Sequence, residues 1–338
     1  MDKARVAILG ATGAVGGEML KILADRRFPI ASLKLLADAN DAGQRIVFEG
    51  REQVVEEARP ESFEGTDITL VAVGNQVSLA FTPEAVRRGS VVIDNSSAYR
   101  LDPGVPLVVP EVNPEDVAWH KGIIANPNCS TIIALVALKP LHDAVGIERL
   151  VVSTYQAVSG AGRMGGVELE AQTLAHLRGE PIKAEVFRHQ IAFNLIPHID
   201  DFLPNAYTKE EMKMQNESRK ILHAAGLRVS ATCARVPVYR SHSESILIET
   251  NRKITPDEAR KLLRKAPGVR VVDDPASFSY PMPLDSSDQD LVLVGRIRED
   301  LSSEKGLQLW VCGDQVRKGA ATNAVQIAEL LLGGGAGR

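Results

Sequence analysis

Cys129 is the residue of this chain with the clearest capacity for covalent chemistry. It follows the tripeptide Asn-Pro-Asn at 126–128, between an apolar strand-like run at 122–125 and an apolar helix-like run at 131–141. An Asn-Pro pair interrupts an extended segment, so the cysteine falls on the first turn of the next helix. Unpaired N–H groups and the positive end of the helix dipole stabilise a thiolate there. The pattern indicates a nucleophile; the alternative is a buried structural thiol, the commoner fate of a free cysteine.

A glycine-rich turn near the start of the chain has the form of a dinucleotide site. It follows the short apolar run 5–9 and precedes a helical pattern at 15–26. Glycines permit the tight turn and let backbone N–H groups approach a pyrophosphate at the helix N-terminus. The spacing is G-x-x-G-x-x-G, and an ordinary turn is the alternative, but the position after the first strand favours cofactor binding. The candidate cofactor contacts are Gly10, Thr12, Gly13, Ala14, Val15 and Gly16.

Length and composition are those of an ordinary enzyme. The chain has 338 residues, enough for two domains, with 44% hydrophobic and 24% charged residues. A formal net charge of −4 provides no basic surface, so we expect no nucleic-acid or membrane partner. Three widely spaced cysteines and seven histidines without ligand spacing indicate neither disulfides nor a metal. With no apolar run near ~20 residues and no room for a signal peptide before the first strand, we expect a cytoplasmic protein.

The first third of the chain alternates strands and helices, which predicts a doubly wound parallel sheet. Helices are expected near 15–26 and 83–88, the second opened by Thr82-Pro83. Strands are expected at 5–9, 33–37, 68–73, 90–94 and 107–109.

From about Arg149 the pattern changes to longer strands and fewer, longer helices. A helix is expected at 165–177, and capping boxes at Thr208 and Thr255 open two more, to 225 and 265. The expected strands are 150–156, 229–236, 245–250, 291–297 and 307–312, in a mixed, largely antiparallel sheet. A last helix, 319–332, lies beyond that sheet and is expected to return to the first domain. The predicted domains are 1–128 with about 319–338, and 129–318.

Several motifs together resemble the aspartate-semialdehyde dehydrogenase family, in its bacterial branch. The resemblance spans the chain from Gly10 to Gln326. It rests on the segments at 94–100 (Asp-Asn-Ser-Ser-Ala-Tyr-Arg), 126–131 (Asn-Pro-Asn-Cys-Ser-Thr), 153–162 and 210–214, and on Arg235 with His242. It implies a Rossmann-type domain joined to an α+β catalytic and dimerisation domain with a mixed sheet.

The resemblance implies that the enzyme interconverts L-aspartyl-4-phosphate and L-aspartate 4-semialdehyde, using inorganic phosphate and a nicotinamide. Cys129 matches the family's acyl-thioester nucleophile and His242 its acid/base. Arg235 matches the clamp for the substrate α-carboxylate, since a planar guanidinium binds a carboxylate through two hydrogen bonds. Gln156 matches a substrate-positioning residue, and one of Glu210 and Glu211 is expected to contact the substrate amino group.

The remaining carried-over positions bind phosphate or cofactor. Arg100 and Lys213 match the phosphate-binding pair, because two cations can stabilise a phosphate dianion, with Asn95 as a supporting donor. Ser159 and Gly160 are expected to border the nicotinamide, and Gln315 or Asn323 to contact it. Cys233 and Cys312 are interpreted as buried strand residues.

The resemblance also implies a place in lysine (diaminopimelate), threonine and methionine biosynthesis, and a homodimer or a tetramer formed through the second domain. Three alternatives remain open. An N-acetyl-glutamyl-phosphate reductase shares the chemistry, but the Gln156 motif and the Arg235/His242 spacing favour the aspartyl enzyme. A sugar-phosphate aldehyde dehydrogenase would not need the Arg235 clamp. A catalytically silent nucleotide-binding paralogue would be favoured by a missing nucleophile or base, and both are present.

One loop departs from the family pattern. Where relatives commonly have Ala-Ser-x-Arg-Ser-Ala-Gly, which holds the 2′-phosphate of NADP, this chain has Ala-Asp-Ala-Asn-Asp-Ala-Gly at 37–43. The carboxylates of Asp38 and Asp41 suit the free ribose hydroxyl of NAD and repel a phosphate, with Asn40 between them. NADP is the cofactor by resemblance, and this loop predicts that NAD is accepted or preferred. In the alternative, the loop bends away and a distant arginine such as Arg45 binds the phosphate.

Overall fold

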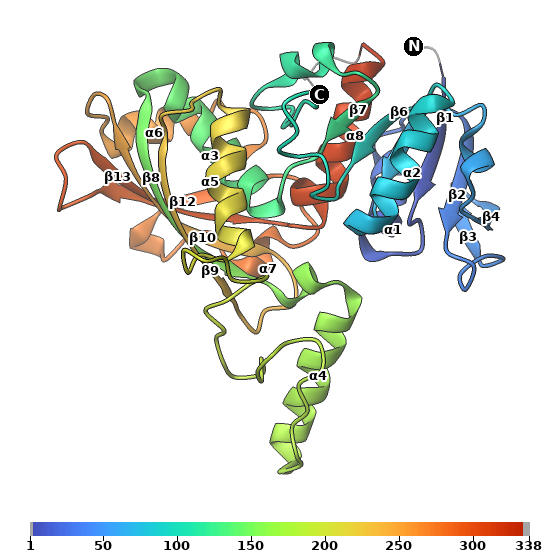
Figure 1. Cartoon of the computed structure of the whole chain (residues 1–338). Helices are drawn as coiled ribbons and strands as arrows, with labels where there is room; N and C mark the ends of the chain where they lie inside the picture. Colours follow the sequence, from blue (N-terminus) through green and yellow to red (C-terminus); the bar gives the residue numbers. More distant parts are fainter. Residues whose placement is uncertain (1–2, 334–338) are drawn as a thin grey trace. The chain divides into compact units, whose positions relative to one another are not determined.

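The structure, a computed structural model, describes residues 3–333 (Figure 1). Contacts between residues divide the chain into two units. One contains the chain up to Asn128 together with the segment from Ala320 onward, and the other contains Cys129–Gly319. Each unit is described by itself.

The first unit is built on a seven-stranded sheet with the strand order β3-β4-β2-β1-β5-β6-β7. All neighbouring strands are parallel except the β3–β4 pair, which forms an antiparallel hairpin. The strands are β1 (Ala4–Leu9), β2 (Ile30–Ala37), β3 (Arg45–Phe48), β4 (Arg51–Glu57), β5 (Ile68–Val71), β6 (Val91–Asp94) and β7 (Ile123–Ala125), and the helices are α1 (Ala14–Asp25), α2 (Asn75–Arg87) and α8 (Thr322–Leu331).

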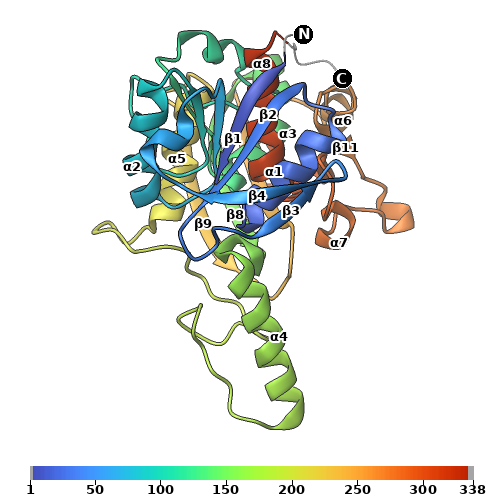
Figure 2. The same cartoon turned by 90° about the vertical axis from the view of Figure 1, so that its right-hand side faces the viewer.

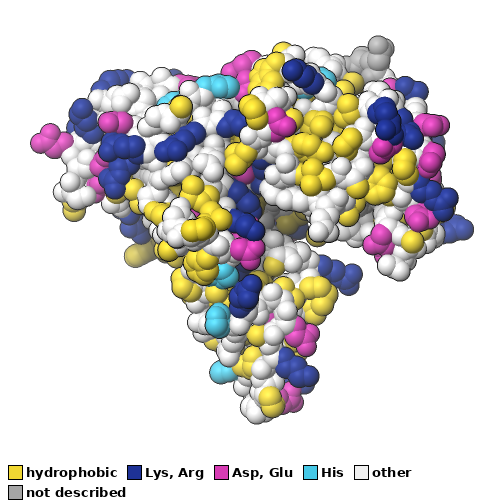
Figure 3. Space-filling model, in the orientation of Figure 1, with side chains coloured by type: hydrophobic (Ala, Val, Ile, Leu, Met, Phe, Trp, Pro, Cys, Tyr) yellow, Lys and Arg dark blue, Asp and Glu magenta, His cyan; other side chains and the backbone are white. Residues whose placement is uncertain are grey.

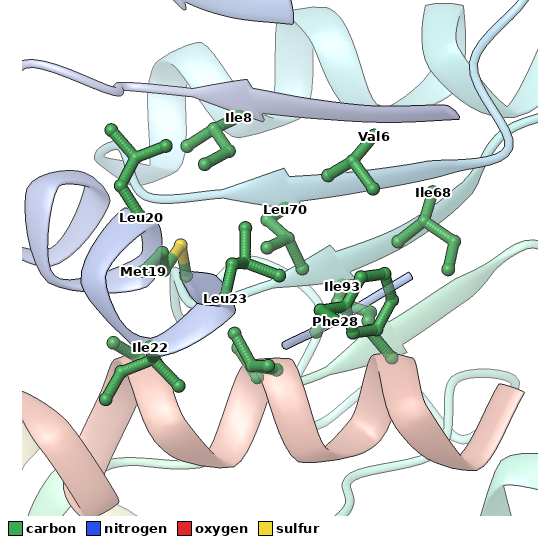
Figure 4. Packing of buried hydrophobic residues seen from close by; sticks show 14 of the residues in the cluster. Val6, Ile8, Met19, Leu20, Ile22, Leu23, Phe28, Ile68, Leu70 and Ile93 are labelled. Carbon is green, nitrogen blue, oxygen red and sulfur yellow. The ribbon is translucent and has the colours of Figure 1, made fainter. Parts of the chain in front are cut away.

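The core of this unit explains why the C-terminal helix belongs to it. Apolar side chains of β1, β5 and β6, such as Ile8 and Leu70, face α1 and the last helix of the chain (Figure 4). Val325 and Ile327 of α8 are fully buried in the same cluster as Met19 of α1. Removing this apolar surface from water stabilises the unit by roughly 25 cal/mol for each Å² buried.

For this unit, the sequence analysis missed one hairpin and was wrong about two other elements. The hairpin β3–β4 was not predicted, because its strands are largely exposed and lack apolar alternation. Residues 107–109 form no strand, only a single bridge from Leu107 to Ala125. Helix α2 begins at Asn75, and Pro83 lies inside it rather than at its start. Proline removes one backbone donor there, but burial of Ser78, Thr82 and Ala85 holds the helix across it.

The second unit contains a six-stranded mixed sheet with the order β11-β12-β13-β10-β8-β9. The strands are β8 (Ile147–Gln156), β9 (Arg228–Arg235), β10 (His242–Thr250), β11 (Val269–Val271), β12 (Val292–Glu299) and β13 (Gly306–Gly313), and the helices are α3 (Cys129–Val145), α4 (Arg163–Arg178), α5 (Lys209–Ile221), α6 (Pro256–Leu263) and α7 (Pro283–Ser286). Short 3-10 helices occur in this unit at Val158–Ala161 and Pro275–Ser277, and in the first unit at Pro60–Phe63 and Pro114–Trp119. A π-helical turn is formed by Arg317–Ala321. Both predicted capping boxes, at Thr208 and Thr255, are present.

Helix α4 and the chain that follows it, residues 163–207, form an arm that extends from the sheet of this unit (Figures 1 and 2). Its returning segment has almost no regular structure, and buried polar side chains of α4 hold it instead. The carboxylate of Glu168 accepts the N–H groups of Glu185 and Phe187, and Gln172 accepts those of Ile191 and Ala192. Hydrophobic side chains gather on the visible face beside the base of the arm (Figure 3).

Candidate active site

Three of the predicted site residues lie at the ends of adjacent strands in the second unit. Gln156 ends β8 and pairs in register with Arg235, which ends β9. His242 begins β10, the other neighbour of β8. This strand starts three residues before the predicted 245, so the histidine is part of the sheet. All three side chains are buried, with exposed fractions of 2%, 7% and 0%.

The backbone of Ala157, directly after β8, orients two of these side chains. Its N–H donates to Nδ1 of His242 at 3.0 Å, and its carbonyl accepts a hydrogen bond from Nη1 of Arg235 at 2.6 Å. The Arg235 guanidinium also lies 5.9 Å from the ring centroid of Phe187 in the arm. The imidazole and the guanidinium are thus fixed relative to each other through one peptide unit.

Burial and charge keep the His242 ring neutral. Desolvation lowers the pKa of His242 most, and the positive charge of Arg235 lowers it further. The Glu210 carboxylate acts in the opposite direction but does not compensate, so the pKa falls to about 3. The pKa of Arg235 is also lowered, first by burial, against the opposing charges of Glu210 and Cys129. Cys129 is therefore close enough to Arg235 to influence it.

Gln156 links His242 to an acidic side chain. Its Oε1 accepts a hydrogen bond from Thr154 Oγ1 at 3.0 Å, and its Nε2 donates to Glu210 Oε1 at 3.1 Å. The same Nε2 lies 3.3 Å from Nε2 of His242. Thr154 precedes Gln156 by two residues and shares its face of the strand, so it holds the amide from behind.

The adjacent residues Glu210 and Glu211 have different environments. Glu211 completes the capping box of α5, accepting the Thr208 N–H at 2.7 Å, and its other oxygen accepts the Cys233 N–H at 3.0 Å. Glu210 instead contacts Gln156 and, at 3.0 Å, Nζ of Lys213. The sequence left both residues as candidates, and the structure brings Glu210 to the other site residues.

Lys213 lies between two carboxylates. Its Nζ is 2.9 Å from Asp200 and 3.0 Å from Glu210. Burial lowers its pKa, but the two ion pairs outweigh burial and raise it overall, so the ammonium stays charged. Any anion that Lys213 binds must compete with Asp200, a residue that the sequence analysis missed.

Cys129 begins α3, as its position after the Asn-Pro-Asn turn predicts, and it is partly exposed. A Cβ on Gly319 would stand 2.9 Å from the Cys129 Cβ, so only glycine fits against this cysteine. Cys233 and Cys312 are buried strand residues, and burial raises both thiol pKa values, that of Cys312 to about 11. Low thiolate content makes them poor nucleophiles.

Of the residues expected near the nicotinamide, Ser159, Gly160 and Gln315 lie around His242, whereas Asn323 lies in the first unit. Gln315 donates a hydrogen bond to Ser159 Oγ and accepts one from the Ser241 N–H at 2.8 Å. Ser241 directly precedes His242, so this bridge supports the start of β10. Gly160 faces both Arg235 and His242.

In the first unit, the glycine turn closes as the motif predicts. Gly10 has φ of +89°, and a Cβ on Gly16 would stand 2.1 Å from the Gly10 carbonyl oxygen. Helix α1 follows with Gly13 at its N-cap; this helix start has no side-chain cap and no acidic residue in its first turn. Its N–H groups can therefore bind a phosphate of a nucleotide.

The loop after β2 is held by its own acidic residues. Asp38 accepts the N–H groups of Asn40 and Asp41 at 2.8 and 3.3 Å, which shapes a tight turn. Asp41 accepts hydrogen bonds from Thr12 of the glycine turn and from Gln44. Arg45 forms an ion pair with Glu52. The loop therefore turns toward the glycine motif rather than away from it.

The other candidates of this unit form a polar network around Asn126. Arg100 donates to the carbonyl oxygens of Asn126 and Asn95 at 2.9 and 2.7 Å. The Asn126 amide donates to Asn95 Oδ1, and Asn323 of α8 donates to Asn126 Oδ1 at 2.7 Å. Asn323 is fully buried, so it holds the segment before Cys129.

Within residues 3–333, no helix is both long and apolar enough to cross a membrane.

Residues 5–120 match the family described as semialdehyde dehydrogenase, NAD binding domain, and residues 138–318 match semialdehyde dehydrogenase, dimerisation domain. An aspartate-semialdehyde dehydrogenase from Aquifex aeolicus is 55% identical over 97% of this chain and 98% of its own length.

Solved structures agree with these matches. Aspartate semialdehyde dehydrogenase II from Vibrio cholerae, complexed with ASA, is 47% identical over 98% of this chain and 99% of its own, with a TM-score of 0.96. The enzyme from Candida albicans with NADP is 28% identical over 98% and 99%, with a TM-score of 0.77.

Proposed function

Because this chain belongs to the aspartate-semialdehyde dehydrogenase family, we propose that it interconverts L-aspartyl-4-phosphate and L-aspartate 4-semialdehyde, in the biosynthesis of lysine, threonine and methionine. One observation carries the proposal: Gln156, Arg235 and His242 lie together at the ends of adjacent strands, and Cys129 is close enough to influence the pKa of Arg235. An amino-acid acyl phosphate needs a nucleophile and a carboxylate clamp, and these residues supply both.

Cys129 is the nucleophile of this proposal. The start of α3 and the charge of Arg235 favour its thiolate, which attacks the acyl carbon and expels phosphate to leave a thioester. Arg235 binds the substrate α-carboxylate with the part of its fork that Ala157 does not occupy. Glu210, rather than Glu211, contacts the substrate amino group, and Gln156 donates toward the developing oxyanion.

A nicotinamide cofactor supplies the hydride that reduces the thioester. The uncapped start of α1 and the glycine turn fit its pyrophosphate, because no side chain in the described part of the chain caps this helix start by a hydrogen bond. Ser159, Gly160 and Gln315 are proposed to border the nicotinamide. Asn323 is proposed to support the segment before Cys129 through its hydrogen bonds to Asn126 and Val108. Arg100 and Lys213, with Asn95 in support, are proposed as phosphate ligands.

NAD is proposed to be used at least comparably with NADP. The contact between Asp41 and Thr12 places a carboxylate beside the glycine turn, where it disfavours the 2′-phosphate of NADP. The structure of the C. albicans enzyme is one with NADP, and comparing kcat/KM for the two cofactors tests the proposal for this chain.

The protein is proposed to form a homodimer through its second unit. The arm exposes large hydrophobic side chains, among them Leu177, Phe193 and Phe202. Such side chains are normally covered in an assembly. Sedimentation of the purified protein should give the mass of two chains or of four; a stable monomer would contradict the proposal.

The activity is tested by adding L-aspartate semialdehyde, inorganic phosphate and either NAD+ or NADP+ to the purified protein. We expect reduction of the nicotinamide that depends on both semialdehyde and phosphate. N-acetyl-glutamate semialdehyde is the comparison substrate. Equal or faster use of that compound, or reduction without phosphate, would overturn the proposed function.

A further inference from the structure

The two carboxylates beside Lys213 differ in how firmly they are held. Glu210 has only 7% of its side chain exposed, and the oxygen that does not contact Lys213 accepts a hydrogen bond from Gln156. Asp200 has 32% of its side chain exposed, and its Oδ2 lies 2.9 Å from Lys213 Nζ. A partly exposed carboxylate can turn toward water at little cost, whereas a buried one cannot leave its partners cheaply. Asp200 is therefore the partner of Lys213 that another anion can replace.

A local turn of the backbone brings Asp200 to this position. The residue lies near the end of the arm, shortly before Thr208, the N-cap of α5. Its φ is +69°, in the left-handed region that aspartate and asparagine enter more readily than most residues. Its Oδ1 accepts the N–H of Asp201 at 2.8 Å, and its Oδ2 accepts a hydrogen bond from Lys213. The turn thus holds this carboxylate within reach of the ammonium.

The charges around Lys213 oppose a bound phosphate. Two carboxylates surround one ammonium, which leaves an excess of negative charge. A phosphate group carries more than one negative charge near neutral pH, and like charges at such short range repel each other. Phosphate can therefore bind Lys213 well only when the Asp200 side chain has moved away.

We propose that Asp200 is an exchangeable counter-ion of Lys213, which leaves the ammonium when phosphate binds and returns when phosphate departs. The proposal rests on the proposed function for the assignment of phosphate to Lys213. Exchange of one anion for another keeps the partly buried ammonium paired, so phosphate leaves without exposing an uncompensated charge. Phosphate is a product when the acyl phosphate is reduced. By lowering the affinity of the site, Asp200 speeds its release in that direction.

The residue that follows Asp200 offers a comparison within the same turn. Asp201 forms an ion pair with Lys209, at 2.8 Å, and both side chains are exposed. Like the pair of Asp200 with Lys213, this pair joins the end of the arm to α5. If Asp200 served only to attach the arm, its loss and the loss of Asp201 would have the same effect.

Binding of inorganic phosphate in the absence of semialdehyde tests the proposal directly. NAD+ is added at saturation, so that phosphate does not occupy the glycine turn. Asp200→Asn removes the charge, keeps an oxygen to accept the Asp201 N–H, and suits the positive φ. By isothermal titration at constant ionic strength, we expect its Kd for phosphate to fall at least about threefold, within the range of one partly exposed ion pair. Because the expected change is a gain, misfolding cannot produce it.

Asp201→Asn is the control and should keep the wild-type Kd. The gain of Asp200→Asn should also shrink when Lys213 is replaced by alanine, because Asp200 acts through the ammonium. An equal or weaker affinity of Asp200→Asn, the same gain in Asp201→Asn, or an undiminished gain beside Lys213→Ala would each overturn the proposal.

Steady-state kinetics in the phosphorylating direction provide the second measurement. KM for phosphate should fall in Asp200→Asn by the factor seen in Kd, while KM for the semialdehyde stays within about twofold of the wild type. Normal oxidation of the semialdehyde with an unchanged phosphate affinity would overturn this proposal alone. Tighter phosphate binding without any oxidation of the semialdehyde would instead contradict the proposed function.

Discussion

Gly160 lies directly against the guanidinium of Arg235. A Cβ at this position would stand 2.6 Å from Nη1, closer than real carbon contacts allow. Nη1 cannot withdraw freely, because it also donates to the Ala157 carbonyl at 2.6 Å. The space for the proposed carboxylate clamp therefore depends on the absence of one methyl group.

Gly160→Ala is expected to displace the Arg235 fork and to raise KM for the semialdehyde by about tenfold or more, since a lost charged hydrogen bond costs about 1.5–3 kcal/mol. Steady-state kinetics measure this. Gly166→Ala is the matched control: Gly166 lies in α4, and a Cβ there would stand 3.9 Å from Tyr239, an ordinary van der Waals contact. The control should keep the wild-type kinetic constants. An unchanged KM in both variants would show that Gly160 does not influence the carboxylate clamp.

Cys129→Ala is expected to reduce kcat by at least about a thousandfold, because removing a nucleophile removes the covalent route. Nucleotide binding and thermal unfolding should stay as in the wild type. Cys312→Ala is the control, since that buried thiol lies on β13 beside Ser243 and is not part of the group formed by Gln156, Arg235 and His242. A Cys129→Ala enzyme that keeps more than a few per cent of activity would rule out the thioester.

Arg235→Lys is expected to weaken use of the semialdehyde by about a hundredfold in kcat/KM, while KM for the nicotinamide changes little. An ammonium cannot hold both the Ala157 carbonyl and a carboxylate with the geometry of a planar fork. Arg228→Lys, at the exposed start of the same strand, is the control. Equal kinetic constants for the wild type and Arg235→Lys would show that the clamp lies elsewhere.

Because of the acidic loop at 38–41, we expect kcat/KM for NADP to be less than a hundred times that for NAD. A hundredfold ratio corresponds to about 2.7 kcal/mol. Replacing both Asp38 by Ser and Asn40 by Arg should shift the preference toward NADP, because a carboxylate is removed and a cation is added. Kinetics with both cofactors measure the ratio. No shift in the double variant would place the 2′ contact outside this loop.

Much of this organisation could be predicted from local sequence. The glycine turn, the helix start at Cys129 and the capping boxes at Thr208 and Thr255 depend on residues within one turn of each other. The exposed hairpin β3–β4 has no such pattern and forms because β4 pairs with β2.

Contacts between distant segments could not be predicted. The hydrogen bonds of the Ala157 backbone to Arg235 and His242 connect segments about 80 residues apart and leave no mark on the sequence. Likewise, the sequence alone does not distinguish the role of Glu210 from that of Glu211. Only the phase of α5, set by the Thr208 cap, directs one carboxylate to Gln156 and the other to the cap.

Glu244→Gln is expected to stabilise the protein increasingly as pH rises. The Glu244 side chain is fully buried on β10, neither of its oxygens has a hydrogen-bond partner in the described part of the chain, and burial raises its pKa well above the ordinary value. A raised folded pKa means that the folded state loses stability as pH climbs above the unfolded value, about 4.3.

Denaturant unfolding should therefore give similar free energies for wild type and Glu244→Gln near pH 4, and a gain of at least about 1 kcal/mol for the variant near pH 8. Glu299→Gln, at the exposed end of β12, is the control and should show no such trend. A gain independent of pH would mean that the carboxyl is not the titrating group.

The register that pairs Gln156 with Arg235 has a consequence for the motions of the protein. These residues belong to β8 and β9, and β8 lies inside the sheet, hydrogen-bonded on both edges. The amides of β8 cannot exchange with solvent until the sheet itself opens. In deuterium exchange, the amides of residues 152–156 should therefore rank among the slowest of the molecule, while the arm exchanges early. Losing the alignment of the reactive groups and losing the fold of this unit would then be a single cooperative event.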